Sequence, residues 1–99
     1  MYIDEIRSFV PRTMAEAADQ RQILDYVNLF PDTILTRENP IAHMTASGFI
    51  LSRDGRWVLM AHHNIYQVWA WTGGHADGEK DLLSVALREA REETGAGHI

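Results

Sequence analysis

The chain has 99 residues, 45% of them hydrophobic, which allows for one small globular domain. Its formal net charge of -5 argues against a nucleic-acid polymer as partner, because phosphate backbones are bound through clusters of Lys and Arg. The absence of cysteine excludes disulfides and zinc–thiolate sites.

The first forty residues predict two helices. Apolar residues recur at helical spacing from Ile3 to Val10, and Pro11 interrupts them. A second helical pattern runs from Met14 to Phe30, and Pro31 ends it. The apolar stripe of this second helix contains Ala17, Ile23, Leu24 and Val27. We expect a helical extension that packs on the rest of the chain.

The middle of the chain predicts strands. Met44 to Leu51 is rich in β-forming residues, and Asp54-Gly55 is a hairpin turn signal. Trp57 to Ala61 is predicted to form the returning strand of the hairpin. The apolar stretch from Ile65 to Trp71 predicts a further short strand.

A double glycine and a helix close the chain. Gly73-Gly74 is expected to open a short polar loop, in which a flexible backbone can approach a phosphate or donate a carbonyl. The helix is predicted from about Leu82 to Thr94, with Asp81 at the N-cap and Gly95 as its stop.

The predicted helix separates carboxylates from apolar residues. At about 100° per residue, Glu89, Glu92 and Glu93 share one face. The face expected to pack on a core carries Leu83, Ala86, Leu87 and Ala90. The acidic face is typical either of a solvated surface helix or of a site for a hard divalent cation. The crowding of like charges and the glycines upstream favour the cation site.

This segment resembles the Nudix box of the Nudix hydrolases. The family pattern is a glycine, five residues, a Glu, seven residues, then Arg-Glu-apolar-x-Glu-Glu-x-Gly. With Gly74 as the first glycine, the box spans Gly74–Ala96 and its second half matches at Arg88, Glu89, Glu92, Glu93 and Gly95. Lys80 stands where the family has its first Glu, and Glu79 precedes it.

The resemblance implies an α/β (α+β) fold, the N-terminal part of a Nudix-like α/β/α sandwich with a mixed sheet. We expect the Nudix domain over residues 39–99 and the helical extension over residues 1–38. Because the family's catalytic domain usually continues past the box, the chain is expected to be a fragment that lacks the C-terminal portion of the domain. The full-length protein is a candidate homodimer.

The resemblance also implies an activity. It predicts a hydrolase that uses Mg²⁺ or Mn²⁺ to cleave a pyrophosphate bond in a nucleoside diphosphate linked to another group. The implied catalytic residues are Arg88, which orients a glutamate, and Glu89, Glu92 and Glu93. The implied metal ligands are the Gly73 carbonyl and the same three glutamates. The implied substrate-binding residues are Gly73, Gly74, Trp71 and His75.

Some alternatives stay open from the sequence. Lys80 supports a nucleotide-binding or polyphosphate-binding module that keeps the fold and has weak or no catalysis, and a metal-free structural fragment is the third class. Trp69 and Trp71 either stack on a base or belong to a core. His62 and His63 point to opposite faces of a strand and cannot both serve one metal ion.

The sequence also bears on location. No apolar run approaches membrane-spanning length, and the N-terminus lacks a signal-peptide profile. We therefore expect a cytoplasmic protein that does not associate with membranes.

Overall fold

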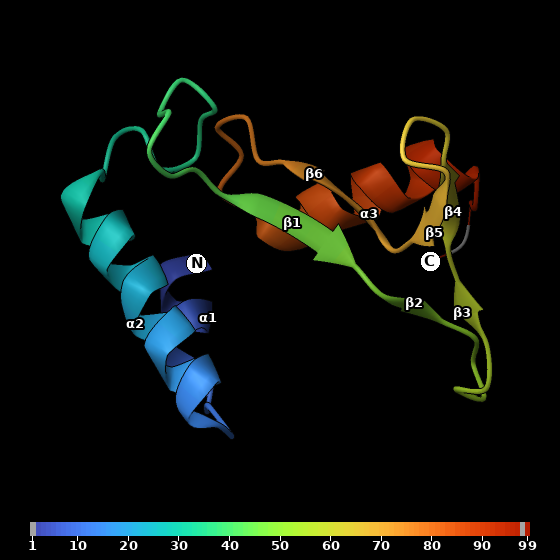
Figure 1. Cartoon of the computed structure of the whole chain (residues 1–99), viewed down its shortest axis with the longest axis horizontal. Helices are drawn as coiled ribbons and strands as arrows, with labels where there is room; N and C mark the ends of the chain where they lie inside the picture. Colours follow the sequence, from blue (N-terminus) through green and yellow to red (C-terminus); the bar gives the residue numbers. More distant parts are fainter. Residues whose placement is uncertain (1, 98) are drawn as a thin grey trace.

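Three helices and six short strands make up the protein in a computed structural model that describes residues 2–97 and 99 (Figure 1). The helices are α1 (Tyr2–Ser8), α2 (Met14–Leu29) and α3 (Leu82–Thr94). The strands are β1 (Thr45–Gly48), β2 (Ile50–Leu51), β3 (Val58–Leu59), β4 (Ala61–His63), β5 (Val68–Ala70) and β6 (Thr72–His75).

The two N-terminal helices lie close to the predicted bounds, but Ala17 and Ile23 of the predicted apolar stripe are exposed. Thr13 caps α2 by accepting a hydrogen bond from the Glu16 amide at 3.0 Å, and the Glu16 carboxylate accepts one from the Arg12 amide at 2.8 Å. The first bond satisfies an amide donor of the first helical turn, and the second holds the residue that precedes the cap. Beneath the helices lies a core centred on Tyr2, Val27 and Ile34.

The strands form three antiparallel pairs, β1 with β6, β2 with β3, and β4 with β5. The predicted Asp-Gly turn closes the β2–β3 hairpin, where Gly55 has a φ of +74° and the Ser52 amide donates to the Trp57 carbonyl at 2.9 Å. In the β1–β6 ladder, Thr45 lies opposite His75 and Gly48 opposite Thr72.

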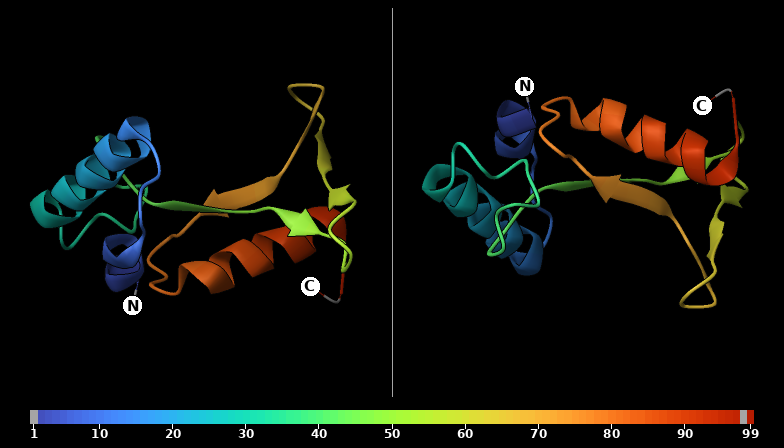
Figure 2. Two further views of the ribbon diagram at one scale, coloured as in Figure 1. Left: turned by 90° about the horizontal axis from the view of Figure 1, so that it is seen from below. Right: turned by 90° about the horizontal axis from the view of Figure 1, so that it is seen from above.

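Helix α3 lies along one side of the β1–β6 ladder, and the β4–β5 hairpin projects on the other side (Figure 2). Asp81 caps the helix by accepting hydrogen bonds from the Ser84 amide at 3.3 Å and the Ser84 hydroxyl at 2.7 Å. Gly95 ends it in the left-handed conformation at φ +75°. The predicted bounds, cap and stop of this helix are confirmed.

The α+β class predicted from the sequence is confirmed, but two local predictions are wrong. Gly73 and Gly74 lie within strand β6 and not in a polar loop, because their backbones pair with Ser47 and Ala46 of β1. Leu83 does not enter the core, since it is 66% exposed while Val85 is fully buried.

The aromatic residues of the β4–β5 region are mostly exposed. Trp69 is 67% exposed and Trp71 57% exposed, so the alternative that both belong to a core is wrong. His62 packs edge-on against Trp69 across the β4–β5 pair, with ring centroids 5.1 Å apart. Among the described residues, no helix combines the length and the hydropathy needed to cross a membrane.

Candidate active site

Strand β6 and helix α3 approach each other most closely at Gly74 and Glu89. A Cβ atom added to Gly74 would lie 2.5 Å from Cδ of Glu89 and 2.7 Å from its Oε1. The Glu89 carboxylate therefore occupies the space that any larger residue at position 74 would fill. Only glycine allows this approach, which explains the residue type at the start of the box in physical terms.

Gly73, the other glycine of the pair, is held against strand β1. A Cβ at Gly73 would lie 2.5 Å from Oγ of Ser47 and 3.0 Å from the carbonyl oxygen of Ala46. The Gly73 amide donates a long hydrogen bond of 3.4 Å to Oε1 of Glu93. The two glycines thus bring one strand backbone against two carboxylates that stand one helical turn apart.

Arg88 contacts its neighbour Glu89 by one hydrogen bond, from Nη2 to Oε1 at 3.4 Å. The predicted contact between Arg88 and a glutamate is present, although it is single rather than bidentate. The Glu89 side chain is 20% exposed and that of Arg88 45% exposed. Glu92 is exposed.

The donor set suits a hard cation, although its carboxylates are not preassembled. Among residues 2–97 and 99, no three His, Cys, Asp or Glu side chains converge as a metal cluster. Glu89 and Glu93 nevertheless line the same stretch of strand backbone, because the Glu89 carboxylate lies against Gly74 and Oε1 of Glu93 accepts from the Gly73 amide. Carboxylate and carbonyl oxygens are the ligands that Mg²⁺ and Mn²⁺ take, so the residues fit the ion.

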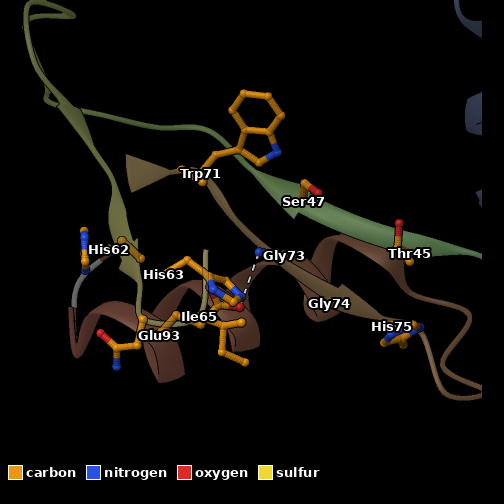
Figure 3. A pocket seen from close by; sticks show the side chains of 13 residues that line it. Thr45, Ser47, His62, His63, Ile65, Trp71, Gly73, Gly74, His75 and Glu93 are labelled. Atoms are coloured by element: carbon orange, nitrogen blue, oxygen red, sulfur yellow. Dashed lines mark hydrogen bonds between the residues drawn. The ribbon is translucent and has the colours of Figure 1, made fainter. Parts of the chain in front are cut away.

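A pocket of about 780 Å³ opens beside these glycines (Figure 3). Its lining joins β1, β4, the end of β5, β6 and α3, and it includes Ser47, Trp71, Gly73, His75 and Glu93. This volume lies in the usual range for small-molecule sites. All four predicted substrate-binding residues, Trp71, Gly73, Gly74 and His75, line the pocket.

Lys80 lies away from the carboxylates. It borders a small depression beside Tyr2 and Glu5 of α1, at the start of α3. In the described part of the chain no ion pair joins Lys80 to Glu89, Glu92 or Glu93. A cation this close in sequence to three carboxylates predicts an ion pair with one of them, and that prediction is wrong. The reason is the helix length, since Glu89 lies about 10 Å along the axis from Leu82.

Two further interactions near the site escaped the sequence analysis. Arg37 and Asp77 form a two-pronged ion pair, with Nε to Oδ1 and Nη2 to Oδ2 both at 2.9 Å. The hydrogen bond from Arg37 lowers the pKa of Asp77 below its usual value, and Asp77 raises the pKa of Arg37. His43 contacts His75 through their ring nitrogens. Both pairs join residues more than thirty positions apart, so local spacing carries no signal for them.

The fold and the site together define an α+β domain in which a strand with two glycines packs on a helix that carries Arg-Glu-x-x-Glu-Glu. The sequence model of the NUDIX domain matches residues 42–99, which is more than half of the chain. The chain therefore belongs to the NUDIX domain family, a family of hydrolases. No curated protein matches the chain.

Proposed function

We propose that this protein is a Nudix-type hydrolase, dependent on Mg²⁺ or Mn²⁺, that cleaves a pyrophosphate bond in a nucleoside diphosphate linked to another group. The observation that carries the proposal is the packing of Glu89 and Glu93 against the Gly73–Gly74 backbone, at the edge of a pocket of about 780 Å³. Acidic side chains beside a pocket would repel a diphosphate unless a cation neutralised them.

Each residue has a role that follows from its position. Glu89, Glu92, Glu93 and the Gly73 carbonyl would hold the ion. When bound, the ion would neutralise the phosphate charge and lower the pKa of a water molecule. Arg88 holds the Glu89 carboxylate in place, so it acts as a positioning residue. The absence of a side chain at Gly74 lets the Glu89 carboxylate lie against the strand backbone, next to the Gly73 carbonyl.

The far part of the pocket suits the nucleoside. Trp71 is 57% exposed and lines the pocket, so one face of its indole is available to a base. Stacking of a base on an aromatic ring contributes about 1–3 kcal/mol and is tolerant of base identity. His75 lines the same pocket on β6, next to the glycines, where its ring can contact a phosphate.

Hydrolysis assays on a panel of nucleoside diphosphate derivatives test the proposal. We expect turnover that requires Mg²⁺ or Mn²⁺ and that falls by orders of magnitude in Glu93→Gln, which keeps the side-chain shape and removes the charge. Glu38→Gln, an exposed carboxylate on the loop after α2, is the matched control. Equal turnover in both variants would contradict the assignment of Glu93 to the active site.

Lys80 at the position of the first box glutamate favours a second candidate, a nucleotide-binding module without catalysis. The same panel separates the two functions. Calorimetric binding of a nucleoside diphosphate derivative, with no turnover in either metal, would support the module and contradict the hydrolase.

A further inference from the structure

His43 and His75 form a close pair on the ladder, beside the carboxylate site but chemically distinct from it. Nε2 of His43 lies 3.2 Å from Nδ1 of His75, and the ring centroids are 5.1 Å apart with the planes inclined by 27°. The proposed hydrolysis uses His75 at the phosphate, but it gives no role to His43 or to the contact between the two rings.

The register of the ladder explains why the rings meet. Thr45 pairs with His75, and the Ala76 amide donates to the Met44 carbonyl at 3.1 Å. His43 and His75 are therefore diagonal neighbours across an antiparallel pair. Because side chains alternate along a strand, both point to the same face, while Met44 and Ala76 point toward the buried side.

The ring of His43 is fixed by a second contact. Nδ1 of His43 lies 3.0 Å from the Asn39 carbonyl oxygen, so it must carry the proton and donate it. This leaves a lone pair on Nε2, facing His75. Asn39 is itself 5% exposed, and its side chain accepts from the amides of Ile41 and Ala42 and donates to Thr33. Metal-binding histidines commonly have this outer hydrogen bond to a carbonyl.

We propose that His43 and His75 form a two-imidazole site for a divalent transition-metal ion such as Zn²⁺. With zinc–nitrogen bonds of about 2.0–2.1 Å, two nitrogens 3.2 Å apart subtend an angle of about 100° at the ion. That angle suits two neighbouring ligands of one tetrahedral ion. Without the ion, His75 donates its Nδ1 proton to His43. With the ion, that proton resides on Nε2 of His75, and both facing nitrogens hold lone pairs.

The ligand type separates this site from the carboxylate site. Imidazole nitrogen selects Zn²⁺, Ni²⁺ and Cu²⁺, whereas carboxylate and carbonyl oxygens select Mg²⁺ and Mn²⁺. No third metal-ligating side chain joins the two histidines among the residues that the structure describes, so water completes the shell. Asp77 lies nearby, but both of its oxygens are bound to Arg37.

Zinc calorimetry on the whole chain, with Mg²⁺ in large excess to occupy the carboxylates, tests the site. We expect one Zn²⁺ per chain, and at least tenfold weaker binding in His43→Gln and in His75→Gln. The matched control is the double variant His62→Gln/His63→Gln, which removes the exposed adjacent pair on β4 and should bind zinc as the unaltered chain does. Loss of binding in the control, with retention in the other two variants, would overturn the proposal.

A second measurement needs no variant and holds even if His43→Gln fails to fold. Long-range ¹H–¹⁵N spectra of the unaltered chain should show that Zn²⁺ shifts Nε2 of His43 and Nδ1 of His75, with the Nδ1 proton of His43 retained. Zinc-induced shifts confined to other imidazoles, or absent altogether, would contradict the site. Neither readout depends on hydrolysis, so failure here and failure of the proposed hydrolase are separate results.

Discussion

Replacing Gly74 with alanine probes the closest contact in the candidate active site. The new Cβ would lie 2.5 Å from Cδ of Glu89, 2.7 Å from Oε1 and 2.9 Å from Cγ. Non-bonded carbon atoms settle about 3.5–4.0 Å apart, so the Glu89 side chain must withdraw by about 1 Å or more. It is long and reaches solvent, which allows the withdrawal without a shift of the backbone.

The expected result is a loss of function with little loss of stability. Displacement of a catalytic group by about 1 Å lowers the reaction rate by about 10²-fold. Mg²⁺-dependent turnover in Gly74→Ala should therefore fall by about two orders of magnitude. The free energy of unfolding should change by less than about 1 kcal/mol, since a flexible side chain absorbs the clash. Hydrolysis rates and thermal melting of the same preparations measure both quantities.

Two other glycines provide the comparison. In Gly73→Ala the new Cβ meets backbone atoms of β1, at 3.0 Å from the Ala46 carbonyl oxygen and 3.1 Å from the Ser47 Cα. Backbone cannot withdraw easily, so this variant should lose about 1–3 kcal/mol of stability. Gly97→Ala meets no atom within 4 Å and should change neither quantity. Unimpaired turnover in Gly74→Ala, or destabilisation as large as that of Gly73→Ala, would refute the reasoning.

Three further predictions concern charges around the site. Mg²⁺ affinity, measured by calorimetry, should fall at least tenfold in Glu93→Gln and stay unchanged in Glu79→Ala. Of these two carboxylates, it is Glu93 that reaches the strand backbone. Equal affinities in the two variants would contradict this. Lys80→Glu should leave Mg²⁺ affinity within about twofold, since Lys80 borders α1 at the start of α3, about 10 Å along the helix axis from Glu89. Clearly tighter Mg²⁺ binding in this variant would contradict this. Arg37→Gln should raise the pKa of Asp77 toward its ordinary value of 3.8 in an NMR titration. Because Arg37 lowers that pKa in the folded state, its contribution to stability is present above pH 3.8 and is lost as the pH falls below it.

Local signals in the sequence predicted the helices well. The bounds of α3, its cap at Asp81 and its stop at Gly95 each depend on side chains within a few residues, and so does the Asp-Gly turn at Gly55. The face that α3 buries was harder to predict, because Leu83 has an apolar side chain and yet lies at an exposed groove. Burial depends on which elements cover the helix, and helical periodicity does not contain that information.

Long-range pairing accounts for what the sequence did not predict. Gly73 and Gly74 have low strand propensity, and only their pairing with Ser47 and Ala46 makes them part of β6. The same pairing brings His43 beside His75. The box residues could be chosen from their spacing, whereas contacts across the ladder require its register.

The alternation of side chains along β6 gives this short strand two different chemical faces. Thr72 and Gly74 face α3, where the missing side chain of Gly74 admits the Glu89 carboxylate. Gly73 and His75 face the opposite side, where His75 meets His43. Since a strand places successive residues on opposite faces, the Glu89 carboxylate at Gly74 and the imidazole of His75 lie on opposite sides of the strand and do not compete for one ion. A shift of the register by one residue would exchange the two faces, so both candidate sites depend on the pairing of Thr45 with His75.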